Sequence, residues 1–515
     1  MRRTRIFGIA ATAAMTIMLA MSVYAGGDAE GGASGAGSEE LTPLRVQVFD
    51  RGNAPEGAGT ATDNDWTEWI QRETQEIGLD VEFAAAPRSE EVQQINIWMA
   101  SGNAPDIMYT YNAPLLFGFA EQGGLQDLEG AIEEHGPAIQ TGLADALEYG
   151  VFQGQQVAIP GRRDAPRGPQ MKIRQDWLDA LGMDAPTNIE ELTEVLRAFK
   201  EQDPGNVGPD RVVPFAVPAP GVVGRPGFYL NVMFGFGVKN DGPDFPTLPG
   251  GNYEDGEYRS PVDHPAARAF YRWMNQLYKE GLLHPEFAVD TRGTRWTQHV
   301  SSGVAGFIDT NQPEMDPVTI DAVPDVDWQI IEPLVAPDGS QTMNRSPVRR
   351  FFNFVPVSSD VADAAVKYIN WQVEAEVDTA LSYGFEGVQH DIEDGIRVVR
   401  EDMEDELHFA PGDLNLIGAV NSLIEPENWA AVYDEKVVQA FTLVSEYGVV
   451  RPVISEPTPV AQELRGTLQR HVFEGAAKVI VADDFESAYD EYVEIWYSLG
   501  GGDYDQEIED FLDKQ

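Results

Sequence analysis

The stretch Ser101-Gly-Asn-Ala-Pro-Asp-Ile-Met-Tyr-Thr-Tyr-Asn112 decides the predicted fold. Apolar residues at helical spacing precede it, and Gly102 offers the positive φ with which many helices end. Pro105 predicts a turn, because its ring restricts φ and keeps the preceding residue out of the helical region. Asp106–Tyr109 then reads as a short buried strand. Ligands of open α/β sheets bind beyond the carboxyl ends of strands, so three side chains at this end are candidate ligand contacts: Tyr109, Tyr111 and Asn112.

The residues on the amino-terminal side of this stretch alternate between strand and helix patterns. Residues 44–49 and 79–83 are predicted strands, and residues 66–77 and 89–100 are predicted amphipathic helices. Strands that are separated by helices predict a parallel sheet with right-handed crossovers. No dinucleotide-binding fingerprint accompanies this pattern.

Charge and composition exclude several classes of partner and site. The chain has 515 residues and a formal net charge of −50, so its surface repels nucleic acid phosphates and anionic membranes. It has no cysteine, which excludes disulfides, thiolate metal sites and a cysteine nucleophile. A length of this order allows a large core and more than one lobe.

The first residues have the features of a targeting segment. Arg2, Arg3 and Arg5 precede an apolar run over residues 6–21, and Ala25 supplies the small residue at a cleavage site, so residues 1–25 are a predicted signal peptide. A transmembrane anchor is the alternative, although the run is marginal for the ~20 residues that a spanning helix needs. Residues 26–42 are rich in small residues and read as a flexible linker.

Several stretches resemble one known family in order and spacing. Besides Ser101–Ile107, they are Lys172-Ile-Arg-Gln-Asp-Trp-Leu-Asp-Ala-Leu-Gly182, Leu277-Tyr-Lys-Glu-Gly-Leu-Leu-His-Pro-Glu-Phe287 and Gly384-Phe-Glu-Gly-Val388. These resemble the family 1 extracellular solute-binding proteins, the sugar-capturing subunits of bacterial ABC importers. The resemblance is strongest to the large branch that includes alginate-oligosaccharide-binding proteins.

The resemblance implies an α/β fold of the periplasmic-binding-protein type with two lobes and a helical C-terminal part. Each lobe is expected to hold a mostly parallel sheet flanked by helices. Lobe 1 is predicted to comprise residues 43–163 and 307–355, and lobe 2 residues 164–306 and 356–515. A monomer is expected, with an ABC transporter permease as partner, a periplasmic or extracellular location, and no membrane insertion after signal cleavage. Many relatives carry a lipid-anchored cysteine after the signal, whereas Gly26-Gly27 stand there in this chain.

No cofactor or metal is expected. In relatives the place of Asp203–Asp210 holds a calcium loop, and calcium needs six or more oxygen ligands. Gly205, Val207 and Arg211 occupy positions that would have to be ligands, so the metal site is predicted to be degenerate.

Catalytic signatures are absent from the sequence. There is no H-E-x-x-H, no G-x-S-x-G and no P-loop, so the chain is predicted not to be an enzyme. A glycoside hydrolase or lyase is the alternative, which requires two carboxylates ~5 to ~9 Å apart that a sequence cannot reveal. A structural or adhesive surface protein is a third hypothesis.

An oligosaccharide is the expected ligand, held between the lobes. Sugars stack their C–H faces on aromatic rings and bond amides and charged groups through their hydroxyls. The further candidate platforms are Tyr229, Trp296 and Phe385, and the further candidate polar contacts are Asn311, Glu386, Gln389 and His390. Core packing is the alternative role for each aromatic side chain.

Arginines cluster near two of the predicted crossovers between the lobes. Arg163 and Arg350 are candidates to bind uronate or other acidic groups, because a guanidinium bonds a carboxylate with two parallel hydrogen bonds. The alternative is that these arginines pair with nearby carboxylates and stiffen the hinge.

Overall fold

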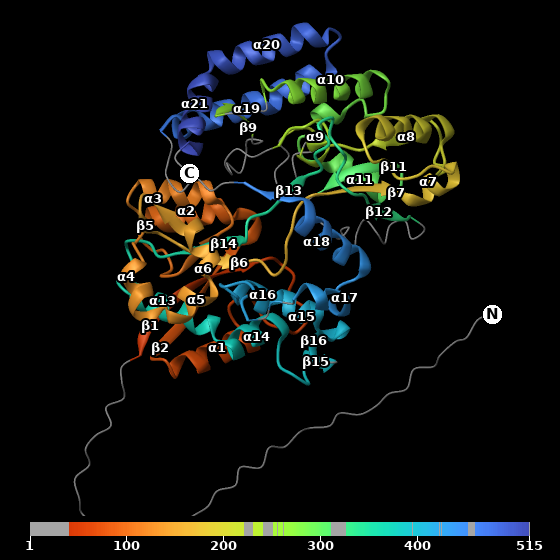
Figure 1. Ribbon diagram of the computed structural model, residues 1–515. Coiled ribbons are helices and arrows are strands. Elements are labelled where there is room, and N and C mark those ends of the chain that lie inside the picture. The colour runs from red at the N-terminus through yellow and green to blue at the C-terminus, as the bar shows by residue number, and fades with distance from the viewer. Residues whose placement is uncertain are drawn as a thin grey trace, which may run out of the picture. The chain divides into compact units, whose positions relative to one another are not determined.

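The computed structural model describes residues 41–513 except 221–229, 240–250, 255, 261, 311–325, 394, 422, 424 and 452–458 (Figure 1). The predicted signal peptide lies outside the described residues, as does all of the predicted linker before Leu41. Within the described ranges, no helix combines the length and the apolar composition needed to span a bilayer.

The first sheet begins with three strands that run in one direction. Strand β1 (Thr42–Asp50) pairs in parallel with β2 (Leu79–Pro87), from Thr42 opposite Leu79 to Asp50 opposite Pro87. Strand β3 (Met108–Thr110) joins the other side of β1 through a parallel bridge between Val46 and Ile107. Helices α1 (Asp65–Gln75) and α2 (Glu91–Ser101) connect the strands, and Gly102 ends α2 with a φ of 67°. The predicted parallel β-α-β-α-β unit is therefore confirmed.

Two later strands extend this sheet beyond β3. The first of them, β14 (Arg349–Phe354), runs antiparallel to β3, with Phe352 opposite Thr110. The second, β6 (Ile159–Arg162), runs antiparallel to β14, with Arg349 opposite Arg162. The strand order is thus β2-β1-β3-β14-β6.

The second sheet has the order β12-β7-β11-β8. Strand β7 (Gln170–Arg174) is antiparallel to both β11 (Ala305–Thr310) and β12 (Trp328–Ile330), whereas β8 (Val213–Phe215) is parallel to β11. Three of the four strands therefore run in one direction, and β7 runs against both of its neighbours. Connectivity explains this reversal, because β7 brings the chain into the sheet and β11 leads it out.

Two large hydrophobic cores surround the two sheets. Helix α13 (Ala362–Val373) packs into the first core, and helices α8 (Ile189–Gln202) and α10 (Pro265–Lys279) pack into the second. The C-terminal part is helical as expected, and its helices also enter the second core: α19 (Pro459–Val481), α20 (Phe485–Ser498) and α21 (Gly501–Leu512). Figure 1 shows α19 and α20 beside α10, and α21 packs against α19 and α20.

The segment of residues 364–417 packs into the core of the first sheet. Residues 364–417 contribute to the first core, although the sequence-based division puts residues 356–515 in lobe 2. An amphipathic pattern identifies a helix and its apolar face, but it does not say which of two sheets that face covers. The division of the chain into lobes otherwise stays a prediction.

The remaining elements are short helices and strands around these sheets. Those between β3 and β7 are α3 (Ala113–Glu121), α4 (Glu129–His135), α5 (Pro137–Gly142), α6 (Ala144–Leu147), β4 (Val151–Phe152) and β5 (Gln155–Gln156). Those between β7 and β12 are α7 (Gln175–Leu181), α9 (Leu230–Phe234), β9 (Asn252–Glu254), β10 (Glu257–Arg259) and α11 (Thr294–Ser301). The later ones are β13 (Met343–Arg345), α14 (Ala375–Tyr383), β15 (His390–Glu393), β16 (Ile396–Val399), α15 (Glu404–Phe409), α16 (Pro411–Leu414), α17 (Trp429–Val432), α18 (Glu435–Tyr447) and β17 (Gly448–Val450).

Candidate functional site

The ends of five strands meet along one edge of the first sheet. Asp50 and Pro87 lie opposite each other at the carboxyl ends of β1 and β2. Four residues beyond the bridge between Val46 and Ile107, the register brings Tyr111 level with Asp50. Strand β14 begins at this edge and β6 ends there, because Arg349 lies opposite Arg162. The register therefore gathers Arg51, Arg88, Tyr111, Arg163 and Arg350 at this edge, and we call these five residues the basic edge.

The half-buried ring of Tyr111 lies at the centre of the basic edge. The guanidinium carbon of Arg88 is 4.6 Å from the centroid of this ring, and the ring of Phe351 meets it edge-on at 5.5 Å. The main-chain N–H of Tyr111 donates to Oε1 of Glu91 at 2.9 Å. The ring contacts fix the side chain of Tyr111, and the hydrogen bond fixes its main chain.

Two of the arginines are each anchored by a buried carboxylate. Nη1 of Arg88 donates to Glu91, which also accepts a hydrogen bond from the hydroxyl of Thr110. Nε of Arg51 donates to both carboxylate oxygens of Asp413, at 2.9 and 2.7 Å. Burial opposes the charge of Arg51, but the hydrogen bond and the charge of Asp413 keep its pKa above the ordinary value. In the described part of the chain, the terminal nitrogens of Arg51 have no hydrogen-bond partner.

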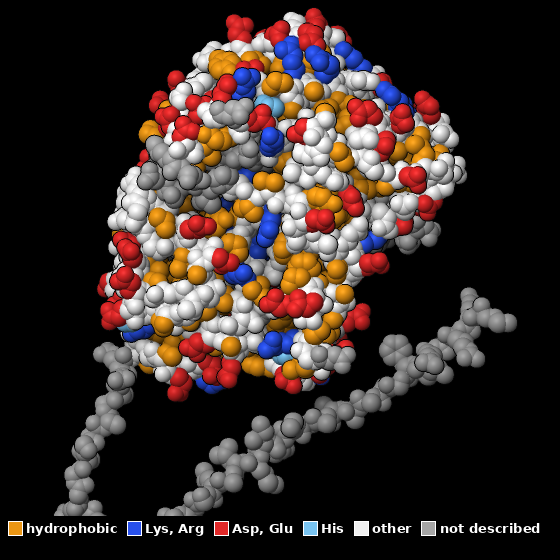
Figure 2. Space-filling view, viewed as in Figure 1, with side chains coloured by type: hydrophobic (Ala, Val, Ile, Leu, Met, Phe, Trp, Pro, Cys, Tyr) orange, Lys and Arg blue, Asp and Glu red, His pale blue; other side chains and the backbone are white. Residues whose placement is uncertain are grey.

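The other two arginines have no carboxylate within ion-pair distance among the described residues. Nε of Arg163 donates only to the main-chain oxygen of Pro347, at 3.2 Å. Burial, followed by the positive charges of Arg349, Arg350 and Arg167, lowers the pKa of Arg163 to about 10. The guanidinium carbon of Arg350 is 5.7 Å from the ring centroid of Phe351. Arg163 thus remains charged at neutral pH although its surroundings are positive. Figure 2 shows Lys and Arg side chains along the middle of the visible face and acidic side chains to either side.

The predicted contacts from residues 385–390 form a separate group. Phe385 is 39% exposed, and its ring stacks on Trp66 at 5.2 Å with an interplanar angle of 5°. Glu386 is exposed. Gln389 and His390 are buried and are engaged within the fold, since Gln389 bonds the main chain of Phe385 and the side chain of Glu406, and Nδ1 of His390 lies 3.1 Å from the oxygen of Tyr383.

Three other predicted contacts have structural roles in this conformation. Tyr109 is buried in the first core, and its hydroxyl donates to the main-chain oxygen of Asp413 at 3.2 Å. Trp296 is buried, and its indole N–H donates to Ala216 at 3.1 Å. Asn112 caps α3 through a hydrogen bond from the N–H of Leu115. Core packing, the alternative role, therefore describes Tyr109 and Trp296.

Two predicted contacts, Tyr229 and Asn311, lie outside the described residues. Of the remaining ones, the structure brings Tyr111, Arg163 and Arg350 together, and ligand contact by them stays a prediction. Sequence reasoning missed Arg51 and Arg88. Each is the first residue after a strand of the parallel unit, and this position is the signal that identifies them.

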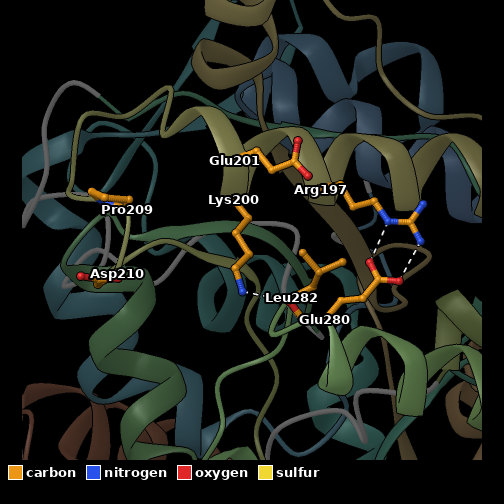
Figure 3. A pocket seen from close by; sticks show the side chains of 7 residues that line it. All are labelled: Arg197, Lys200, Glu201, Pro209, Asp210, Glu280 and Leu282. Atoms are coloured by element: carbon orange, nitrogen blue, oxygen red, sulfur yellow. Dashed lines mark hydrogen bonds and ion pairs between the residues drawn. The ribbon is translucent and has the colours of Figure 1, made fainter.

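A pocket of about 650 Å³ lies elsewhere, at the C-terminal end of α8, and we call it the α8 pocket. Figure 3 shows its lining residues, which are Arg197, Lys200, Glu201, Pro209, Asp210, Glu280 and Leu282. Arg197 forms two hydrogen bonds with the carboxylate of Glu280, at 2.7 and 2.9 Å. Nζ of Lys200 donates to the main-chain oxygens of Glu280 and Gly281. The cations Arg197 and Lys200 are therefore both engaged with acceptors of the protein itself.

The loop of residues 203–210, which is predicted from the sequence to be a degenerate calcium loop, lies beside the α8 pocket. The two carboxylate oxygens of Asp203 accept from the N–H groups of Val207 at 2.9 Å and Gly208 at 2.8 Å. Asp203 thus stabilises the turn of its own loop. Among the described residues, no group of three or more His, Cys, Asp or Glu side chains is placed to hold a metal ion. The degenerate character of the loop stays a prediction.

No family model matches the chain. Lipoprotein LipO of Bacillus subtilis is 25% identical over 83% of this chain and 85% of its own length. The polygalacturonan/rhamnogalacturonan-binding protein YtcQ of the same organism is 22% identical over 84% of this chain and 85% of its own length. Among solved structures, an ABC-transporter-associated solute-binding protein of Bifidobacterium longum infantis that binds HMO superposes with a TM-score of 0.70 at 19% identity. This superposition covers 92% of this chain and 99% of the other, and it confirms the predicted two-lobed α/β fold.

Proposed function

We propose that this chain, a homologue of the extracellular solute-binding proteins of bacterial ABC importers, is exported, captures an oligosaccharide and delivers it to a membrane permease. Support comes from the relatives that cover most of the chain and from a structural neighbour that is itself a solute-binding protein. The names of YtcQ and of this neighbour describe binding proteins, which favours a binding protein over a glycoside hydrolase or lyase.

The observation that carries this proposal is the position of Tyr111 among hydrogen-bond donors at the strand ends. A tyrosine ring offers an apolar face to the C–H groups of a sugar, and guanidinium groups donate to its hydroxyls. Arg88 and Arg51 flank this ring, and each is oriented by a carboxylate that is buried in the fold. Groups held in this way lose little conformational entropy when a ligand binds.

We further propose that the ligand lies between the lobes and that the monomer closes over it. The basic edge includes Arg163 and Arg350, which stand where the chain leaves β6 and enters β14. A ligand at this edge would contact the segments that connect the lobes, so binding and hinge closure would be coupled. The closed form would present a single surface to the permease.

Substitution of Tyr111 tests this function. Tyr111→Ala removes the ring at the centre of the basic edge, and we expect it to weaken oligosaccharide binding about tenfold, because stacking contacts of this kind contribute up to about 1.5 kcal/mol. Calorimetry on an oligosaccharide found by thermal-shift screening measures the effect, since a ligand that binds the native state raises its melting temperature.

Tyr497→Ala is the matched control, because this tyrosine is 48% exposed on α20 and lies outside the basic edge. We expect its affinity to equal that of the wild type. Unchanged affinity of Tyr111→Ala would contradict the assignment of the site, and release of shortened sugars on incubation would instead support the hydrolase or lyase hypothesis.

A further inference from the structure

The four arginines of the basic edge depart from the overall charge of the chain. The chain has 85 acidic and 35 basic residues, so carboxylates outnumber cations more than twofold. At the basic edge this relation is reversed, because Arg51 and Arg88 each have one carboxylate partner, and Arg163 and Arg350 have none within ion-pair distance among the described residues. A local excess of positive charge in so acidic a protein needs a physical explanation.

We propose, on the premise that the protein captures an oligosaccharide, that its ligand is an anionic oligosaccharide and that the basic edge binds its acidic groups. The acidic groups are carboxylates or sulfates on sugar units, both of which match the planar fork of a guanidinium. The proposal names the ligand class of the same site and adds Arg51 and Arg88 to the residues that recognise it.

The arrangement of the four arginines fits a ligand with more than one acidic group. Arg51 and Arg88 lie at the carboxyl ends of β1 and β2, whereas Arg163 and Arg350 lie where β6 ends and β14 begins. Strand β3, which Tyr111 follows, lies between β1 and β14 in the sheet and so separates the two pairs. An oligosaccharide that stacks on Tyr111 would therefore present acidic groups to an arginine pair on either side.

The energetics of the free protein favour this role over that of a hinge brace. A brace would pair each guanidinium with a carboxylate, as Arg167 does with Asp164 at 2.8 Å. Arg163 instead has one main-chain acceptor for Nε. Burial and then the positive charges of Arg349, Arg350 and Arg167 lower its pKa, and the charge of Asp164 offsets them only in part. An anion placed between Arg163 and Arg350 would relieve this repulsion, and the positive edge would locally offset the repulsion of an anionic sugar by the rest of the protein.

Matched sugars test the proposal on the unaltered protein. Calorimetry would compare tetramers of galacturonate, mannuronate and guluronate with their carboxyl-reduced counterparts, which keep every ring and lose only the charge. A sulfated galactose tetramer and its desulfated form provide the second arm. We expect at least one charged tetramer to bind about ten- to a hundredfold more tightly than its uncharged counterpart, because charge-assisted hydrogen bonds are lost with the charge. The arm in which this occurs identifies the acidic group.

Each outcome of this comparison is decisive. Uncharged tetramers that bind as tightly as the charged ones would overturn the anionic ligand and leave the proposed function intact. Absence of binding in every arm would count against both. Tight binding of a charged tetramer would support both.

Substitutions locate the effect at the basic edge. Arg163→Gln and Arg350→Gln should each weaken binding of the charged tetramer about tenfold or more. They should change the affinity for its uncharged counterpart little. Arg163→Lys keeps the charge and loses the planar fork of the guanidinium. Its affinity for the charged tetramer should therefore lie between those of Arg163→Gln and the wild type. The matched control is Arg197→Gln in the α8 pocket, which changes the net charge equally. An equal loss of affinity in Arg197→Gln would contradict the proposal. Lower melting temperatures with unchanged affinity in Arg163→Gln and Arg350→Gln would show that these arginines have a structural role.

Discussion

The basic edge and the α8 pocket both contain arginines, but they differ in what those arginines bind. In the α8 pocket, Arg197 forms a two-pronged pair with Glu280, and Lys200 is bound to two main-chain oxygens. At the basic edge, Arg163 and Arg350 have no carboxylate within ion-pair distance among the described residues, and the carboxylates that anchor Arg51 and Arg88 are buried. For locating a ligand site in this protein, guanidinium groups without a carboxylate partner at the strand ends are thus more informative than the presence of a pocket.

The comparison also separates two kinds of ion pair. Arg197 and Glu280 are 39% and 33% exposed, so water screens their attraction, and such pairs contribute little to stability. Asp413 is 2% exposed at its side chain, so the bond with Arg51 compensates a carboxylate that the fold has removed from water. A buried carboxylate without such a partner should therefore favour its protonated form.

The largest expected effect tests this rule at Asp309, a buried carboxylate in β11. Burial raises the pKa of Asp309 to about 7, although hydrogen bonds from the main chain of Asn231 and Val232 and the side chain of Asn231 act in the other direction. Because the folded-state pKa lies above the unfolded value of 3.8, the stability contributed by the protonated carboxyl is fully present below about pH 4. It is lost as the pH rises through about 7.

Urea unfolding between pH 5 and pH 8 measures this loss. The wild type should lose on the order of 2–4 kcal/mol of unfolding free energy over this range through Asp309. Asp309→Asn cannot ionise, so its curve should be flatter by that amount, while the slope that remains includes Asp505, whose pKa burial also raises to about 7. Parallel curves for the two proteins would show that Asp309 is ionised in the folded state without cost.

The second prediction compares the two anchoring carboxylates directly. Asp413→Asn weakens the bond with Arg51 where it is shielded from water, so we expect a loss of about 1.5–3 kcal/mol of unfolding free energy. Glu280→Gln in the α8 pocket should lose less than about 1 kcal/mol, because its pair with Arg197 is exposed. Both values follow from denaturant unfolding at neutral pH, and a larger loss for Glu280→Gln would reverse the comparison.

The third prediction concerns the packing behind the basic edge. A Cβ added at Gly161 in β6 would lie 2.4 Å from the ring of Phe351, so Gly161→Ala must displace this ring. We expect a loss of about 1–3 kcal/mol from overpacking, together with weaker ligand binding because Phe351 contacts Tyr111.

Gly466→Ala in α19 is the matched control, because nothing lies within 4 Å of its added Cβ. There the change should stabilise the protein by about 0.5–1 kcal/mol, since alanine favours a helix interior. Thermal unfolding of both variants checks the pair, and equal shifts of the melting temperature would show that Phe351 moves freely.

Much of the first sheet could be predicted from the sequence because its signals are local. The alternation of strand and helix patterns predicted the parallel unit, and Gly102 ends α2 with the positive φ that was expected. Exact helix ends are harder to predict, because neighbouring polar residues such as Thr187 and Asn188 can both cap a helix, and the structure shows that Asn188 caps α8.

The sequence by itself determined the α/β class, the family resemblance, the acidic character of the chain and the choice of Tyr111 as a candidate ligand contact. These depend on the order of residues along the chain, on periodicity and on total charge. Only the tertiary structure decided that Tyr109 and Trp296 are packed in cores, that residues 364–417 join the first core, and that Arg51 and Arg88 stand beside Tyr111. Such facts depend on strand register and on which surfaces meet, because residues such as Arg51 and Asp413 become neighbours only when segments far apart in the chain pack together.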